Sequence, residues 1–161
     1  MNIKSMKAAT IHDIKEELSN LPSTKVLELC LRLAKYKKEN KELLSYLLFE
    51  SHDEQAFIET AKKEIEDSFD EISGLSLYHV KKSLRKILRT ISKYSRHTGT
   101  KQSELELLIH FCKEVKKTGI PYKKNTALKN IYERQIYKIS NLVLLLHEDL
   151  QYDYKKEMEK L

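Results

Sequence analysis

VLELCLRLA, at residues 26–34, is the stretch that decides the fold, because its apolar side chains follow helical spacing and cover nearly every side of the helix. A helix that is apolar all round belongs at the centre of a bundle, so we predict that this one forms the core. Outward from it, apolar residues recur at helical spacing almost from end to end, and the 161 residues include only three Gly and two Pro. The sequence therefore predicts an all-α fold.

Capping residues and helix breakers divide the chain into six to seven antiparallel helices. The expected helix starts are Thr10, Ser23 or Thr24, Asn40, Asp53, Ser76 and Asn125 or Thr126, with a further helix through residues 105–115. A loop is expected at Arg96–Thr100, and the last helix runs to the end of the sequence unless Ser140 and Asn141 divide it. We predict a single domain, residues 1–161, built as a bundle or as a short superhelical stack of helix pairs.

A faint internal similarity joins two of these helices. LELCLRLAK at residues 27–35 aligns with LELLIHFCK at residues 105–113, an offset of 78 residues. A duplicated helix pair would produce this similarity, and so would two unrelated core helices with similar composition. We favour the second interpretation, because a single pair falls below the number of repeats that stacked arrays need.

Composition and cysteine content indicate the setting of the protein. The longest aliphatic run, Leu142–Leu146, is far shorter than the roughly 20 residues that span a bilayer. The first ten residues contain no long apolar stretch, which predicts that there is no signal peptide. The two cysteines, Cys30 and Cys112, lie far apart in apolar helices, so we expect no disulfide and a reducing compartment. We therefore expect a soluble, cytoplasmic protein.

Positive charge is concentrated in one part of the chain. Residues 76–134 carry 15 Lys and Arg against 4 Asp and Glu, whereas residues 1–75 carry 11 against 15. On a helix through residues 81–96 the cations form one stripe opposite the apolar face: Lys82, Arg85, Lys86, Arg89, Lys93 and Arg96. These six residues are candidates for contact with an anion or with a nucleic-acid backbone. A second basic cluster surrounds Pro121: Lys116, Lys117, Lys123, Lys124 and Lys129.

Two other interpretations of the basic helix are open. The preceding helix, Glu50–Glu71, carries nine acidic residues against Lys62 and Lys63, and consecutive helices normally pack antiparallel. The acids could therefore neutralise the basic helix within the chain, which is the interpretation we favour. Contact with an anionic membrane is the weakest interpretation, because the helix lacks Trp and Phe anchors.

The histidines do not form a recognisable catalytic or metal-binding pattern. His12-Asp13 and His52-Asp53 resemble the HD pair of metal-dependent phosphohydrolases, but that chemistry needs further ligands, and Asp53 fits better as a helix cap. His110 and Cys112 are two residues apart on a helix, so they point to different faces. We therefore predict no catalytic residue, no metal ligand and no cofactor.

The late tyrosines and the missing catalytic pattern suggest an interaction role. Tyr152 and Tyr154 lie in a polar segment, where exposed aromatic rings would form a partner contact. We predict a non-enzymatic module that binds another protein or itself and does not bind a membrane. The alternative is a nucleic-acid-binding protein that uses residues 81–96, and a metal-dependent HD-type hydrolase is a minor alternative.

The N-terminal part of the chain carries one weak resemblance. The segments IKEEL at residues 14–18, LP at 21–22, LEL at 27–29 and KELLSYLL at 41–48 are similar to those of small helical bacterial proteins grouped as domains of unknown function. The resemblance covers about the first 70 residues and rests on common helix-forming residues. It implies a bacterial cytoplasmic origin, and it implies neither an activity nor any site residue.

Overall fold

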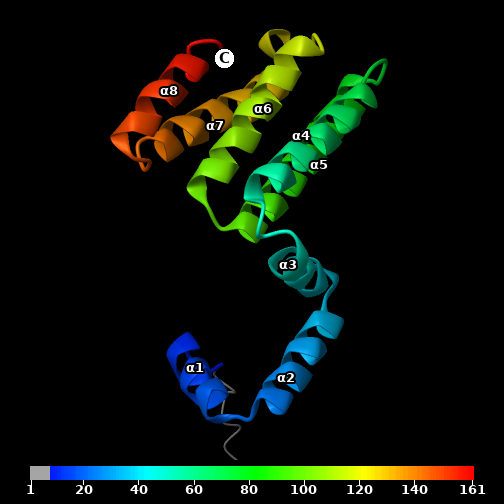
Figure 1. Cartoon of the computed structure of the whole chain (residues 1–161). Helices are drawn as coiled ribbons and strands as arrows, with labels where there is room; N and C mark the ends of the chain where they lie inside the picture. The colour runs from blue at the N-terminus through cyan, green and yellow to red at the C-terminus, as the bar shows by residue number, and fades with distance from the viewer. Residues whose placement is uncertain (1–7) are drawn as a thin grey trace, which may run out of the picture. The chain divides into compact units, whose positions relative to one another are not determined.

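Figure 1 shows the computed structural model of the chain, which describes residues 8–161. These residues form eight α-helices and one 3-10 turn: α1 (Ile11–Asn20), α2 (Ser23–Tyr36), α3 (Lys38–Phe49), α4 (Glu54–Asp70), α5 (Leu77–Thr98), α6 (Lys101–Lys117), η1 (Tyr122–Lys124), α7 (Thr126–Val143) and α8 (Glu148–Met158). No strand occurs within residues 8–161, so the all-α prediction is confirmed. The described helices number one more than the upper end of the predicted range.

The chain divides into two compact units, residues 1–48 and residues 49–161. The prediction that residues 1–161 form a single domain stays a prediction, which limited proteolysis can test.

The second unit is built around α6. Nine residues of α6 are buried, and this helix packs against α4, α5 and α7. Figure 1 shows α6 between the α4–α5 pair on one side and α7 on the other. Leu105, Leu107 and Phe111 are fully buried there, and Phe69 of α4 packs on Phe111 with ring centroids 5.5 Å apart. The core cluster draws its residues from positions 58 to 154.

The prediction that residues 26–34 form the core is wrong. No residue of α2, Ser23–Tyr36, is buried, and Leu31 at its middle is 47% exposed. The described part of the first unit has one fully buried apolar side chain, Tyr46 of α3. The apolar pattern correctly predicts the helix, but no element within residues 8–48 buries it.

Most predicted helix ends are confirmed, and their caps explain why. Thr10 and Asp13 form a capping box on α1, because each side chain accepts a backbone N–H from the other residue. Asp53 and Asn125 accept the N–H groups of Ala56 and Leu128 at the starts of α4 and α7. Gly119 follows α6 with φ of 68° and precedes Pro121, an arrangement that commonly ends a helix.

Three predicted boundaries are wrong. Asn40 does not cap its own helix, since α3 begins at Lys38 and the Asn40 amide donates to the Leu33 carbonyl at the end of α2. The loop expected at Arg96–Thr100 is shorter, because α5 continues to Thr98 before Gly99 adopts φ of 68°.

The last predicted helix is divided at residues 144–147, beyond Ser140 and Asn141, which stay helical within α7. Gln151 of α8 stabilises the break by donating to the carbonyls of Leu144 and Leu146.

Candidate functional site

An apolar surface lies open to solvent on the first unit. Leu27, Leu29, Leu31 and Leu33, which we call the α2 surface, are 40–60% exposed. A groove of about 320 Å³ runs between α2 and α3, lined by Cys30, Leu33, Ala34, Asn40, Leu43, Leu44 and Leu47. Alternate residues of a helix point to different sides, so Leu27 and Leu31 lie on one side of α2 and Leu29 and Leu33 on another. Of the four, only Leu33 lines the groove. Exposed leucines on two sides of one helix are a candidate surface for a partner.

The six predicted cations lie on one face of α5, which we call the basic stripe. Lys82, Arg85, Lys86, Arg89 and Arg96 are exposed, whereas Lys93 is half-buried with its ammonium 5.1 Å from the centre of the Tyr94 ring. The opposite face of α5 is buried through Val80, Leu84, Ile87 and Ile91. The stripe therefore points away from the core of its unit.

The acids of α4 form no ion pair with the five exposed cations of the basic stripe. Among residues 8–161, none of the five exposed cations makes an ion pair. Three carboxylates of α4 are engaged elsewhere: Glu64 accepts from Tyr94, Glu54 accepts from Thr100 and Ser103, and Glu66 contacts His110. Direct ion pairing with α4 is therefore wrong for these five cations, and charge matching at longer range stays an interpretation.

Some lysines of the second basic cluster already have partners within the second unit. Lys116 donates to the carbonyls of Lys160 and Leu161 at 2.7 and 3.0 Å. Lys117 pairs with Glu114 at 3.3 Å and Lys129 with Glu133 at 3.6 Å. Two of the five lysines are therefore paired with carboxylates, whereas Lys116, Lys123 and Lys124 keep their positive charge.

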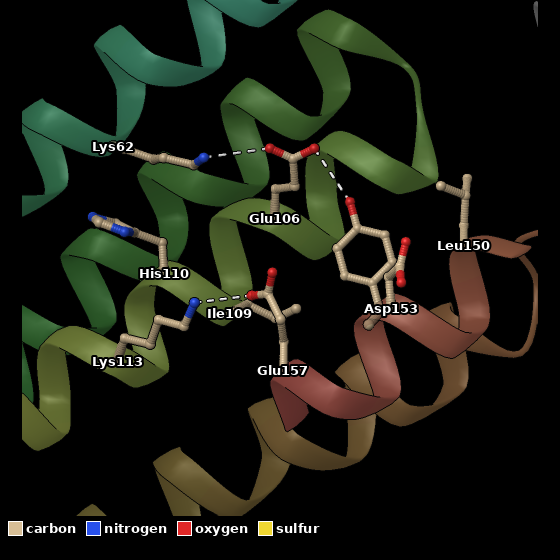
Figure 2. A pocket seen from close by; sticks show the side chains of 9 residues that line it. Lys62, Glu106, Ile109, His110, Lys113, Leu150, Asp153 and Glu157 are labelled. Carbon is tan, nitrogen blue, oxygen red and sulfur yellow. Dashed lines mark hydrogen bonds and ion pairs between the residues drawn. The ribbon is translucent and has the colours of Figure 1, made fainter. Parts of the chain in front are cut away.

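A charged pocket of about 380 Å³ lies between α4, α6 and α8 (Figure 2). Lys62 pairs with Glu106 at 3.4 Å, and Lys113 pairs with Glu157 at 2.9 Å. The hydroxyl of Tyr154 donates to Glu106 at 3.3 Å. Because each lysine already has a carboxylate partner, the pocket is largely self-neutralised and has no obvious preference for a charged ligand.

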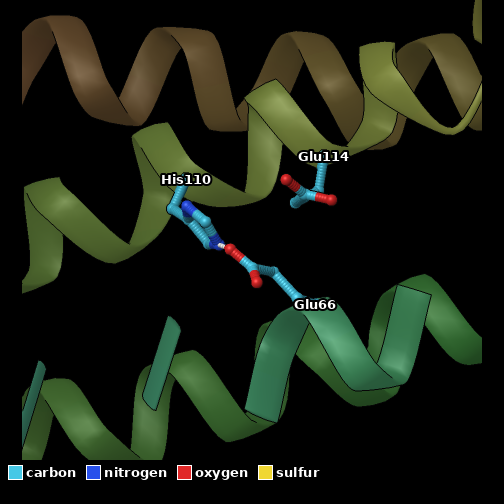
Figure 3. Close-up of side chains that lie close together, drawn as sticks. All are labelled: Glu66, His110 and Glu114. Carbon is cyan, nitrogen blue, oxygen red and sulfur yellow. Dashed lines mark ion pairs between the residues drawn. The ribbon is translucent and has the colours of Figure 1, made fainter. Parts of the chain in front are cut away.

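His110 connects this pocket to a second cluster, which the sequence did not predict. Glu66 of α4 and His110 and Glu114 of α6 each direct one ligand atom toward a common point, and these atoms all lie within 4.8 Å of one another (Figure 3). His110 Nε2 lies 3.2 Å from Glu66 Oε1. Glu114 is 6% exposed, which is rare for a carboxylate.

The pKa of His110 is lowered, although two neighbouring carboxylates would be expected to raise it. Burial lowers the pKa of His110, an effect that outweighs the upward pull of Glu114 and Glu66, and Lys62 lowers the pKa further. The Nε2 atom is buried and makes no hydrogen bond to any described residue. A signal for this cluster was present in the sequence, because Glu114 follows His110 by four residues on a helix, but Glu66 is 44 positions away.

Of the two tyrosines predicted as partner contacts, one is exposed and one is buried. Tyr152 is 62% exposed with the Lys156 ammonium 4.2 Å from the centre of its ring, as a partner contact would need. Tyr154 is only 9% exposed and belongs to the core, because it lies on the face of α8 that turns toward α6. The prediction that it is a partner contact is therefore wrong.

Both HD pairs have local structural roles. His12 contacts Glu16 at 3.6 Å, and the two aspartates cap α1 and α4. Within residues 8–161 the one cluster of three metal-binding side chains contains neither pair. The pairs therefore offer no support for a hydrolase.

Comparison with known protein families, curated proteins and solved structures finds no match to this chain. The resemblance to small bacterial helical proteins, and the origin that it implies, stay predictions. Among residues 8–161, no helix combines the length and apolar character that crossing a bilayer requires.

Proposed function

We propose that the protein is a non-enzymatic interaction module whose first unit binds a helix of another protein or of a second copy of itself. The observation that carries the proposal is the α2 surface, four leucines that are 40–60% exposed on a helix without a buried residue. Burying an apolar side chain gains roughly 1.5–3 kcal/mol, so leaving four of them half in water has a cost that a partner would remove. An amphipathic helix laid into the α2–α3 groove would cover the side of α2 that carries Leu33.

Charge supports a second copy as the first partner to test. α1 carries Asp13, Glu16 and Glu17 against Lys15, whereas α2 carries Lys25, Arg32 and Lys35 against Glu28. In a two-fold dimer, α1 of each chain would face α2 of the other and pair opposite charges around an apolar seam. The exposed apolar side chains of α1, Ile11 and Ile14, would supply its half of that seam.

Sedimentation of the full chain over a range of concentrations tests this. The double variant Leu27→Glu and Leu33→Glu should abolish association, because it places one charge on each of the two apolar sides of α2. The matched control is Leu144→Glu with Leu145→Glu, two leucines of the second unit that are 64% and 60% exposed.

A wild-type chain that stays monomeric at every concentration would exclude a second copy as the partner. If, in addition, an apolar dye binds the wild type and the Leu27 and Leu33 variant equally, the interaction module itself is contradicted.

A second candidate function is nucleic-acid binding by the basic stripe. The specific observation that favours it is that five exposed cations share one helix face and have no ion-pair partner among residues 8–161. Such a face can follow a phosphate backbone, and each neutralised phosphate releases counterions. Tyr78, 67% exposed, lies on the same face one turn before Lys82 and offers a ring on which a base can stack.

A salt titration against mixed-sequence DNA and RNA tests the second candidate. The triple variant Arg85→Gln, Lys86→Gln and Arg89→Gln should weaken binding and reduce the slope of log K against log salt by about 2–3. The control variant Lys35→Gln, Lys37→Gln and Lys41→Gln removes the same charge from the first unit and should keep the wild-type slope. Equal slopes in both variants would contradict a role for the stripe.

The compartment is also part of the proposal. Cys30 and Cys112 are free thiols, one exposed and one buried, and an exposed free thiol suits a reducing cytoplasm. We propose a cytoplasmic location on this ground, and mass spectrometry of the alkylated protein from its source would test whether Cys30 is free in the cell.

A further inference from the structure

We propose that Glu66, His110 and Glu114 form a binding site for one divalent transition-metal cation between α4 and α6. The site is independent of the proposed interaction surface, because all three residues belong to the second unit.

The geometry places three ligand atoms around one point. His110 and Glu114 lie one helical turn apart on α6, and Glu66 faces them from α4 (Figure 3). Their ligand atoms lie within 4.8 Å of one another. A cation that binds nitrogen and oxygen at about 2.0–2.2 Å fits between them after a small inward shift of the side chains.

The buried imidazole nitrogen faces a carboxylate without a hydrogen bond to it: His110 Nε2 lies 3.2 Å from Glu66 Oε1. His110 Nε2 has less than 1 Å² of exposed surface and no hydrogen-bond partner among the described residues. Buried polar atoms are nearly always hydrogen-bonded, and a cation shared by the imidazole nitrogen and the carboxylate oxygen would satisfy both atoms.

The donor set selects the class of cation. An imidazole nitrogen with two carboxylate oxygens suits Zn²⁺, Mn²⁺, Fe²⁺ or Co²⁺. Ca²⁺ and Mg²⁺ prefer sites made of oxygen alone, and the absence of a sulfur ligand from the cluster disfavours Cu⁺. Three protein ligands leave one tetrahedral position for water.

The neighbouring cations do not block the site. Lys117 contacts Glu114 at 3.3 Å, but its side chain is 69% exposed and can move into solvent at little cost. Lys62 is held by Glu59 at 2.7 Å and by Glu106 at 3.4 Å. A bound metal would neutralise Glu66 and Glu114 and link α4 to α6.

Calorimetric titration of the full chain with ZnCl₂, after removal of metals by a chelator, tests the proposal. We expect one Zn²⁺ per chain, a rise in Tm, and a visible tetrahedral absorption spectrum when CoCl₂ replaces ZnCl₂. His110→Ala and Glu66→Gln should each weaken binding at least tenfold. The control, His147→Ala, removes an exposed histidine that contacts Asp149 at 3.3 Å and should leave binding unchanged.

Glu66→Gln keeps the experiment decisive if His110→Ala fails to fold, because the Glu66 side chain is 45% exposed and its replacement should be tolerated. Absence of stoichiometric Zn²⁺ binding to the wild type would overturn the proposal, as would binding that Glu66→Gln leaves intact. In either case the three residues form a buried charge cluster without a cation, and the proposed interaction function is unaffected.

Discussion

The two cysteines show how strongly a side chain's surroundings set its chemistry. Both lie in aliphatic helical segments, yet Cys30 is exposed on α2 and Cys112 is completely buried in α6. Burial raises the pKa of the Cys112 thiol to about 12, which suppresses the thiolate that reacts with electrophiles. Both cysteines lie in apolar helical segments of the sequence, and that pattern alone does not distinguish the exposed thiol from the buried one.

A thiol assay should therefore count one reactive cysteine per native chain. Cys30→Ser should abolish the reaction with a disulfide reagent, whereas Cys112→Ser should leave it unchanged. Denaturant should expose the second thiol of the wild type. Two thiols reacting at equal rates in the native protein would contradict the burial of Cys112.

Tyr154 gives a prediction for alkaline pH. Burial, with a smaller contribution from Glu106, raises the pKa of Tyr154 to about 12 from an ordinary 10. The unfolded chain loses this proton first, so the stabilisation is complete below pH 10 and is lost as the pH rises toward 12. Tyr154→Phe should reduce the alkaline loss of stability by about 1 kcal/mol at pH 11.

Urea unfolding of both proteins at pH 8 and pH 11 measures the effect of Tyr154→Phe. Tyr152→Phe is the matched control, since Tyr152 is 62% exposed, and it should follow the wild type at both pH values. An alkaline loss that is identical in all three proteins would show that Tyr154 does not contribute.

At the scale of helices, α2 and α6 show that a sequence pattern predicts a helix but not its burial. Their aligned segments, residues 27–35 and 105–113, share an apolar pattern, and both are helical. Leu31 is 47% exposed, whereas its counterpart Ile109 is 3% exposed. Periodicity predicts that a segment is helical and which residues are apolar, but burial depends on what other helices bring to that face.

Prediction of the candidate metal site from the sequence is limited in the same way, because spacing does not show which helices pack together. The spacing of His110 and Glu114 could be recognised in the sequence as a pair on one helix face. The third residue, Glu66, joins them only because α4 packs beside α6, and that pairing is a property of the tertiary fold. The basic stripe was predictable in full, since all six of its residues lie on one helix. The sequence could not show that five of them make no ion pair among residues 8–161.

A matched pair of substitutions tests the difference between α2 and α6. Ile109→Asp places an unpaired charge in the core and should cost about 4 kcal/mol or more, enough to unfold the second unit. Leu31→Asp on the exposed helix should change stability by no more than about 1 kcal/mol.

Denaturation followed by circular dichroism, at a protein concentration low enough to keep the chain monomeric, measures both variants. If Leu31→Asp proved as damaging as Ile109→Asp, α2 would have to be covered in the monomer.

At the scale of the whole molecule, the distribution of buried residues separates two kinds of structure. The core cluster, with the side chains packed on it, involves residues 57–161, so the second unit contains its own core. The described part of the first unit has only Tyr46 as a fully buried apolar residue. The all-helical fold was predictable because helix formation depends on the local spacing of apolar residues. The uneven burial was not, because it arises from contacts between distant segments.

Proteolysis should therefore act unequally on the two units. The segment at residues 50–53 joins α3 to α4, and Glu50 within it is exposed, so a protease specific for glutamate should cut there early. We expect a fragment that begins near residue 51 to resist digestion and to melt cooperatively, because it retains the whole core cluster. The first unit, when released, should be degraded quickly, since helices that bury little apolar surface are marginal by themselves. Mass spectrometry of a digestion time course identifies the fragments. Loss of both units at the same rate would instead support the single domain predicted for residues 1–161.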